Sequence, residues 1–308
     1  MRIEMAELRR GYNRVMRILT MLAMATAMLS AADLRLDHAT IAGRDLQAMQ
    51  ARLAEAGIHA VYGGAHTNHA TEMALVSFPD GSYLELMGIQ AHADETALER
   101  QPWAKELRGD AGPCAWAARA PNLAAEAARL KAAGIAVGAP ERGGRERPDG
   151  VRLDWETADV GSAARGTFFP FLIQDFTPRA QRAYPQGKPV TRDFEGVRYV
   201  VIAVRSLDAA VKLYRRAFGF PEPLRQVDAD FGAQLASFGS APVILAQPLT
   251  KDSPVFARIE KFGEGPYAIV LGGARNRSEP AAKSRWFGMD LDWLDRGEIG
   301  WLLGYTRR

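Results

Sequence analysis

Alternating apolar and polar positions divide residues 34–90 into four strands and one helix. Residues 36–42 alternate between two faces, as a strand does, and His38 points to one of them. Apolar residues at helical spacing follow Asp45, a good N-cap, and end at Gly57. Three further extended runs cover residues 60–67, 72–78 and 82–88. This order predicts a βαβββ module.

The last strand of this module carries a single charge on one of its faces. Tyr83, Glu85 and Met87 share that face, and the other face is apolar and suited to packing on the helix. Burying a carboxylate there without a partner costs several kcal/mol. The pattern therefore predicts a partner for Glu85, which would be a metal ion, a protonated histidine or an arginine such as Arg119 or Arg165.

The same pattern recurs three times in the rest of the chain, which indicates internal repeats. The opening strands of the later copies are expected at residues 114–120, 197–204 and 265–271. Their closing strands are expected at residues 166–174, 242–246 and 299–305. Asn122 and Ser206 are suitable N-caps for the helices of the second and third copies.

The later copies lack the polar residues of the first. Aromatic residues align with His38, and they are Trp116, Tyr199 and Tyr267. Apolar residues align with Glu85, and they are Phe169 in the second copy and Ile244 or Leu245 in the third. Chemistry is therefore expected only in the first pair of modules.

The first module resembles the vicinal-oxygen-chelate superfamily, the group of the glyoxalases, bleomycin-resistance proteins and extradiol dioxygenases. The likeness rests on residues 36–42 and 82–88, and the Gly63-Gly64-Ala65-His66 element narrows it to glyoxalase-like members. It implies that the first and fourth strands lie side by side, so that His38 and Glu85 face one cavity.

The resemblance also implies the fold class. This is an α+β fold in which tandem βαβββ modules pair into two curved, mixed-sheet domains. The first domain would cover residues 34–178 and the second, degenerate domain residues 195–308. An arginine- and proline-containing stretch at 177–189 reads as the linker between them.

The histidines of the chain suggest a metal site. All five lie in the first module, at His38, His59, His66, His69 and His92. Two imidazoles and one carboxylate suit a divalent ion such as Zn, Mn, Fe or Ni. The resemblance implies His38 and Glu85 as ligands, with His66, or else His69, as the third. A hydrogen-bonded structural role is the alternative for His38 and the preferred one for His69.

A substrate pocket would lie over this site. Its apolar wall would consist of Tyr83, Trp116, Phe169 and Phe171, and Thr67 and Asn68 would supply hydrogen bonds. Superfamily enzymes usually draw ligands from both modules of a pair, whereas Trp116 and Phe169 cannot coordinate a metal. Without a metal, Glu85 would serve as a general base.

These expectations leave several functions open. The first is a metal-dependent lyase, isomerase or dioxygenase that acts on a small substrate with neighbouring oxygens. The second is a metal-free protein that sequesters a small molecule, as bleomycin-resistance members do. In a third, the second domain is a scaffold for interaction or for a homodimer.

Charge and cysteine content exclude other classes. The net charge of +3 comes from scattered arginines rather than basic blocks, so neither nucleic acid nor an anionic membrane surface is an expected partner. Cys114 is the only cysteine, which rules out an intrachain disulfide and a thiolate metal site. Residues 142–152 read as a flexible basic loop, for which a solvated role is favoured over a clamp for an acidic substrate.

The N-terminal segment has the features of a secretory signal peptide. A basic start at Met16-Arg17 precedes an apolar run and the small residues 30–32. Cleavage near Ala32 would export the protein to the periplasm, and the apolar run is too short for a permanent membrane span. The alternative is a cytoplasmic protein that starts at Met28.

Overall fold

The computed structural model describes residues 34–275 and 280–307. The predicted signal peptide, residues 1–33, lies outside these ranges. Within them, none of the helices combines the length and the apolar character needed to cross a bilayer. From Asp33 onward the chain is one compact unit, and the domain boundaries at residues 178 and 195 stay a prediction.

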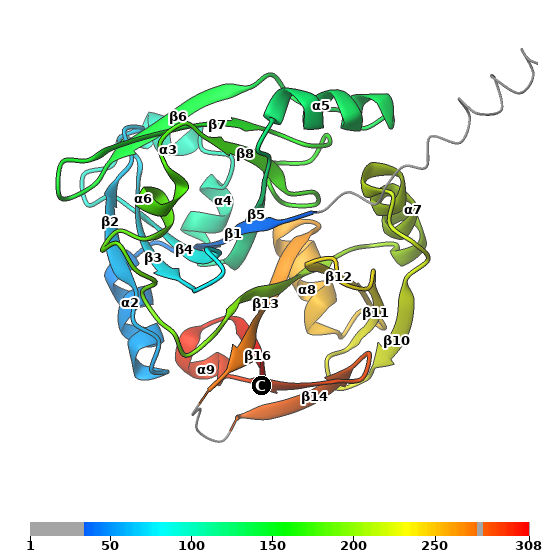
Figure 1. Ribbon diagram of the computed structural model, residues 1–308. Helices are drawn as coiled ribbons and strands as arrows, with labels where there is room; N and C mark the ends of the chain where they lie inside the picture. The colour runs from blue at the N-terminus through cyan, green and yellow to red at the C-terminus, as the bar shows by residue number, and fades with distance from the viewer. Residues whose placement is uncertain (1–33, 276–279, 308) are drawn as a thin grey trace, which may run out of the picture. The chain divides into compact units, whose positions relative to one another are not determined.

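Residues 36–175 form a curved, eight-stranded sheet in the order β2-β3-β4-β1-β5-β8-β7-β6 (Figure 1). Its strands are β1 (Leu36–Ala42), β2 (Val61–Ala65), β3 (Thr71–Ser77), β4 (Tyr83–Ile89), β5 (Gly112–Arg119), β6 (Glu141–Glu146), β7 (Arg152–Ala158) and β8 (Phe171–Asp175). β1 is parallel to β4, β5 is parallel to β8, and β1 and β5 pair antiparallel at the centre. The prediction that the first and fourth strands are neighbours is confirmed.

The two long helices of this sheet begin where the sequence predicts. The Asp45 side chain accepts a hydrogen bond from the backbone N of Ala48 at 3.0 Å and so caps α2 (Leu46–Glu55). Asn122 caps α5 (Leu123–Ala132) in the same way, through the backbone N of Ala125 at 2.9 Å. The short helices of this half are α3 (Glu95–Glu99), α4 (Ala104–Arg108) and α6 (Arg179–Ala183). The predicted linker therefore contains a helix, α6.

The outer strands β2 and β6 approach each other and nearly close the sheet. Gly64 has a φ of 116°, and a Cβ at this position would lie 2.9 Å from the carbonyl O of Glu146 on β6. The Arg145 side chain donates a hydrogen bond to the carbonyl O of Gly63 across the same seam. The Gly63-Gly64 pair therefore allows the two edges to meet.

Two segments differ from the sequence prediction. Residues 142–146, expected to be part of a flexible loop, belong to β6, which pairs antiparallel with β7. Residues 166–170, expected to begin the closing strand, form a turn and a bend, and β8 starts only at Phe171. The φ of Gly166 is 69°, and a Cβ there would lie 2.8 Å from the carbonyl O of Trp116.

The second half repeats this arrangement in the order β10-β11-β12-β9-β13-β16-β15-β14. Its strands are β9 (Gly196–Ala203), β10 (Leu224–Asp228), β11 (Ala233–Ser237), β12 (Val243–Pro248), β13 (Gly265–Ala274), β14 (Ala282–Trp286), β15 (Met289–Trp293) and β16 (Leu302–Arg307). Its helices are α7 (Leu207–Phe218), α8 (Pro254–Phe262) and α9 (Arg296–Ile299). The expectation of an α+β fold with paired βαβββ modules in two curved sheets is confirmed.

Large side chains fill the interior of the second sheet. The aromatic members of this core are Tyr199, Phe231, Tyr267, Trp286 and Trp293. Ile244 pairs with Val201 as Glu85 pairs with Thr40 in the first sheet, so Ile244 rather than Leu245 corresponds to Glu85. The second sheet keeps the architecture and replaces the polar residues by apolar ones.

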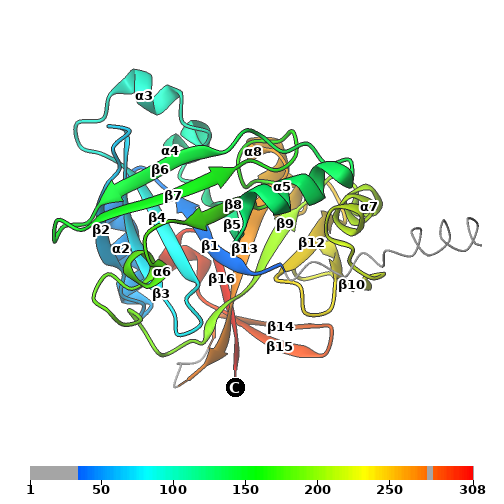
Figure 2. The same cartoon turned by 45° about the horizontal axis from the view of Figure 1, so that its top comes forward.

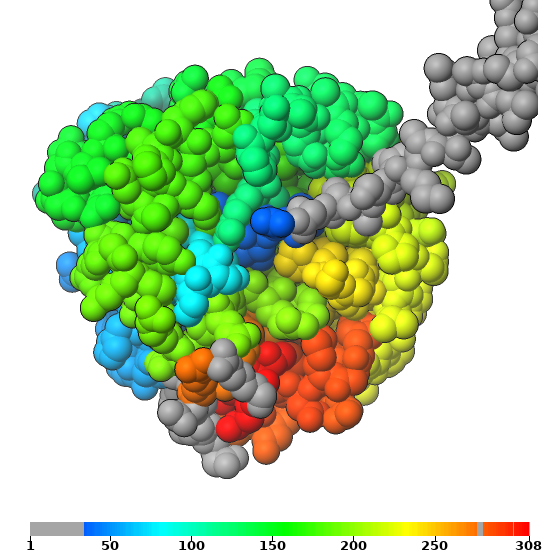
Figure 3. Space-filling view, in the orientation of Figure 1, coloured from blue at the N-terminus to red at the C-terminus, as the bar shows by residue number. Residues whose placement is uncertain are grey.

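The two sheets pack against each other through their central strands. β5 lies along β13 and β1 approaches β9 (Figure 2). The backbone N of Val197 donates a hydrogen bond to Ser82 Oγ at 2.8 Å between the halves. On the face shown in Figure 3, the blue-to-green first half lies against the yellow-to-red second half.

Candidate functional site

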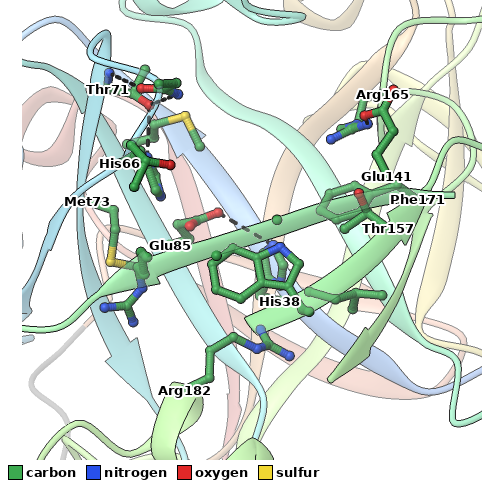
Figure 4. A pocket seen from close by; sticks show the side chains of 18 of the residues that line it. His38, His66, Thr71, Met73, Glu85, Glu141, Thr157, Arg165, Phe171 and Arg182 are labelled. Carbon is green, nitrogen blue, oxygen red and sulfur yellow. Dashed lines mark hydrogen bonds and ion pairs between the residues drawn. The ribbon is translucent and has the colours of Figure 1, made fainter. Parts of the chain in front are cut away.

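The first sheet encloses a cavity of about 300 Å³ (Figure 4). Its floor is formed by β1 and β4, one wall by β3 and the loop after β2, and the opposite wall by β6, β7 and β8. Polar or charged residues in its lining include His38, His66, Thr67, Asn68, Glu85, Glu141, Arg142, Arg145, Arg165 and Arg182. Its apolar part includes Met73, Met87, Trp103, Trp155, Phe171 and Ile173.

His38 and Glu85 meet at the floor of this cavity. The β1–β4 register places His38 beside Tyr83 and Thr40 beside Glu85, so all four side chains share one face of the sheet. The distance from His38 Nε2 to Glu85 Oε2 is 3.4 Å, and Thr40 Oγ1 donates a hydrogen bond to the same oxygen at 3.2 Å. Glu85 is only 9% exposed. Glu85, for which the sequence predicts a partner, therefore has two, the His38 imidazole and the Thr40 hydroxyl.

The other nitrogen of His38 is held by Asp37. His38 Nδ1 lies 2.7 Å from Asp37 Oδ1. Burial opposes ionisation of Asp37, but Arg182, His38 and Arg179 outweigh it and hold the pKa of this carboxyl well below its usual range. Asp37 is therefore a carboxylate that can only accept, so Nδ1 of His38 is the donor.

Asp37 is itself fixed by α6. Arg182 donates from Nη1 to Oδ1 at 2.9 Å and from Nη2 to Oδ2 at 3.0 Å, a bidentate pair. It also donates from Nη2 to Asp175 Oδ2 at 2.9 Å and from Nη1 to the hydroxyl of Tyr83, while Arg179 donates to Asp37 as well. The hydrogen-bonded role that was the alternative for His38 has the neighbouring Asp37 as its partner. The sequence prediction missed Arg179 and Arg182; the signal available was a pair of arginines in a stretch that reads as a linker.

Aromatic rings fix the plane of the His38 imidazole. Tyr83 stacks on it with ring centroids 4.7 Å apart and an interplanar angle of 12°, and Phe171 meets it edge-on at 5.5 Å. Burial raises the pKa of the Tyr83 hydroxyl, so this residue is a neutral wall of the site rather than a base. Tyr83 and Phe171 thus lie where the sequence prediction expected pocket walls.

His66, Thr67 and Asn68 reach the cavity from the loop after β2. His66 Nδ1 lies 2.8 Å from Thr71 Oγ1, which also accepts a hydrogen bond from Asn68 Nδ2 at 2.9 Å. Burial lowers the pKa of His66, an effect that Glu85 opposes and Arg145 reinforces. His66 is therefore a neutral residue. It lines the cavity, and in the described part of the chain it forms no ion pair with Glu85.

Two predicted pocket residues lie elsewhere. Trp116 pairs with Ala39, which points to the face opposite His38, so the indole does not line the cavity. Phe169 packs against Phe168, Tyr214 and Phe218, with ring centroids 4.8–5.8 Å away. The two arginines expected as partners of Glu85 have other partners. Arg119 lies near Asp37. Arg165 pairs with Asp159 and Glu141.

The donors in the cavity do not form a metal centre. Among residues 34–275 and 280–307, no three His, Cys, Asp or Glu side chains are grouped to hold an ion. The predicted set of His38, His66 and Glu85 is thus not assembled, and the cavity-facing positions on the second module include Ala117, opposite His38, and Phe171. The buried guanidinium of Arg145, which lines the cavity and has no carboxylate partner among the described residues, opposes the approach of a cation. The residues present do not fit the divalent ion that the resemblance implies.

Comparisons with known proteins agree with this fold. A hypothetical protein from Staphylococcus aureus has a TM-score of 0.61 and 12% identity, over 89% of this chain and 100% of that one. Methylmalonyl-CoA epimerases match a shorter part. A variant of the Streptomyces coelicolor enzyme has 25% identity and a TM-score of 0.32 over 36% of this chain and 92% of its own. The Mycobacterium tuberculosis enzyme has 19% identity and a TM-score of 0.33 over 38% and 90%. With TM-scores this low, the two partial matches have no bearing on the site of this chain.

Sequence comparison identifies the family. No curated protein matches the chain. The family model described as a glyoxalase-like domain matches residues 36–196, just over half of the chain, and these residues contain the whole first sheet and α6. The chain therefore belongs to the glyoxalase-like domain family, within the vicinal-oxygen-chelate superfamily.

Proposed function

We propose that this protein is an enzyme that transfers a proton to or from a small substrate with neighbouring oxygens, and that Glu85 and His38 perform the transfer. The observation that carries the proposal is the chain of contacts Asp37–His38–Glu85 at the floor of a cavity. A base that is oriented by a second group and faces a cavity large enough for a small molecule is the arrangement that general acid–base catalysis requires.

The contacts of His38 support a proton shared with Glu85. Because Nδ1 carries a hydrogen toward Asp37, a neutral His38 presents the lone pair of Nε2 to Glu85. His38 Nε2 lies 3.4 Å from Glu85 Oε2, so a proton bound by one of the two groups is within reach of the other. Such a pair can both accept a proton and return it.

The proposed step is removal of a hydrogen from a carbon next to a carbonyl. The C–H bond breaks, its electron pair passes into the carbonyl as an enolate, and the proton is taken up by Glu85. Return of the proton to the same or a neighbouring carbon regenerates the pair. Thr40 and His38 would hold the Glu85 carboxyl in one orientation during the transfer.

The metal-dependent reaction suggested by superfamily resemblance is not part of this proposal, because the donor set does not fit an ion. A second candidate is a binding protein without catalysis. The rings of Trp103, Trp155 and Phe171 in the cavity lining favour it, because such walls suit sequestration of a small aromatic molecule.

Hydrogen exchange separates the two candidates. Small 2-oxo acids and ketones are incubated with the protein in D₂O, and ¹H NMR follows the loss of their carbon-bound hydrogens. The exchange rate with protein is compared with the rate in buffer alone. We expect exchange with the wild type and at least about a hundredfold less with Glu85→Gln, since this group is the proton acceptor. Saturable binding of these compounds without exchange would instead support the binding protein.

A further inference from the structure

Among the residues that the structure describes, four arginines line the cavity, and three of them have carboxylate partners. Arg182 pairs with Asp37 and Asp175, Arg165 pairs with Asp159 and Glu141, and Arg142 lies 3.6 Å from Glu156. Arg145, the fourth, forms no ion pair with any residue that the structure describes. It is also one of the most deeply buried charges, at 2% exposed.

Only part of the Arg145 guanidinium is satisfied. One nitrogen, Nη1, donates to the carbonyl O of Gly63, whereas Nη2 is shielded from solvent and has no hydrogen-bond partner within the described ranges. A buried guanidinium nitrogen without an acceptor is costly, and most buried polar groups have at least one partner. Closing the seam between β2 and β6 uses Nη1 alone, so this structural role does not account for the second nitrogen.

The positive charge of Arg145 is not neutralised by any carboxylate that the structure describes. Burial lowers the pKa of its guanidinium, and Tyr83 and Glu85 offset this only in part. Glu85 is already engaged by His38 and Thr40. Beside these groups the cavity lining turns apolar, with Trp103, Trp155 and Phe171.

We propose that Arg145 binds the carboxylate of a small organic monocarboxylic acid, whose apolar remainder packs against the aromatic wall of the cavity. A carboxylate would supply the acceptor that Nη2 lacks and the charge that the buried cation lacks. The binding stands on the arginine and the wall. Only the further consequence, that the carbon next to this carboxyl or its carbonyl is the one that reacts, rests on the proposed function of Glu85.

A carboxylate fits this site better than a phosphate does. Nη2 of Arg145 has no acceptor among the described residues, and Nη1 already donates to Gly63. A ligand bound to Nη2 would lie near the Glu85 carboxyl, which acts on the pKa of Arg145. A phosphate with nearly two charges would meet one unpaired cation and be repelled by Glu85. The other arginines of the lining are already neutralised by their partners.

Calorimetric titration tests the proposal with matched ligands. Phenylacetate and benzoate are compared with phenylacetamide and benzamide, which have the same shape and no charge, and with inorganic phosphate. The proteins are the wild type, Arg145→Met, Arg145→Lys and the control Arg152→Met. Arg152 lies on the neighbouring strand β7, has an exposed side chain paired with Asp154, and does not line the cavity.

We expect the carboxylates to bind the wild type at least about tenfold more tightly than their amides. Arg145→Met should weaken them by about ten- to a hundredfold, Arg145→Lys by less, and Arg152→Met not at all. If Arg145→Met does not fold, the lysine variant and the comparison of acid with amide in the wild type still test the carboxylate site. Equal binding of acid and amide, unchanged binding by Arg145→Met, phosphate bound as tightly as carboxylate, or no binding of either acid at millimolar concentration would overturn the proposal.

Glu85→Gln separates this inference from the proposed function. The variant keeps the arginine and loses the acidic group, so carboxylates should bind it at least as tightly as the wild type. If binding persists while hydrogen exchange is absent from every protein, the proposed function fails and the carboxylate site stands. If exchange of the 2-oxo acids occurs but does not depend on Arg145, the proposed function stands, and the consequence that the carbon next to the bound carboxyl is the one that reacts fails.

Discussion

Replacing Arg182 with methionine tests whether the network behind His38 is structural support for the site. Arg182 is 3% exposed and makes two contacts with Asp37, at 2.9 and 3.0 Å, and two with Asp175, at 2.5 and 2.9 Å. Removing one partner of a buried ion pair costs about 3–5 kcal/mol, because the other charge stays buried. Arg179 still donates to Asp37 and the Asp175 carboxylate is partly exposed, so we expect a loss of about 3 kcal/mol.

Urea unfolding at neutral pH measures this loss as a shift of the midpoint at unchanged slope. The matched control is Arg285→Met, whose partner Asp290 and own side chain are both well exposed, and it should change stability by less than about 0.5 kcal/mol. A loss below about 1 kcal/mol in Arg182→Met, in the range of an ordinary surface change, would refute the reasoning.

The same variant has a pH signature. The pKa of Asp37 is held well below its usual range, so the folded state stays ionised where the unfolded state has taken up a proton. This stabilisation is present above the ordinary aspartate pKa of about 4 and is lost as the pH falls toward the folded pKa. In Arg182→Met the pKa of Asp37 rises toward its usual value, so stability should fall less steeply in acid. An equal acid dependence of both proteins would show that Arg182 does not control Asp37.

Three further outcomes are expected from the structure. Protein purified without chelators should carry less than one equivalent of divalent metal by mass spectrometry, and a stoichiometric ion lost in both His38→Ala and Glu85→Ala would contradict the acid–base proposal. Trp286→Ala should cost about 3–5 kcal/mol in denaturant unfolding, because this ring is fully buried in the filled second sheet, and a loss near zero would mean that the core collapses around it. We propose export, so sequencing the native N-terminus should find a start near Asp33, whereas a start at Met28 or earlier would contradict it.

The strand pattern and the superfamily resemblance together predicted that His38 and Glu85 face one cavity. The period of two places each side chain on a known face, and the superfamily resemblance makes the two strands neighbours. The register of β1 and β5 was not accessible. It shifts on either side of His38–Thr40, so Ala117 rather than Trp116 lies opposite His38. The repeat alignment set Trp116 at the position of His38, and a shift of one residue along a strand moves a side chain to the other face of the sheet.

Partners far apart in sequence were beyond reach for a different reason. Arg182 meets Asp37 across 145 positions, and Arg145 reaches Gly63 across 82. No local pattern marks either arginine as buried, since arginine in a glycine- or proline-rich stretch usually reads as a solvated loop. What places them is the closure of the sheet, which brings β6 to β2 and sets α6 over the end of β1.

The two sheets differ in whether their interiors contain buried charged side chains, and this difference indicates what those side chains are for. Both have the same strand order, and in the second Ile244 and five aromatic rings occupy the interior that Glu85, His38 and the cavity occupy in the first. Buried ion pairs are often no more stable than apolar residues of similar volume, and breaking one is costly. The second sheet demonstrates that this fold accommodates a filled apolar interior, so stability alone does not require the Asp37–Arg182 pair, the His38–Glu85 pair or the unsatisfied Arg145. Their presence is accounted for if a ligand and its chemistry, rather than the fold, need them.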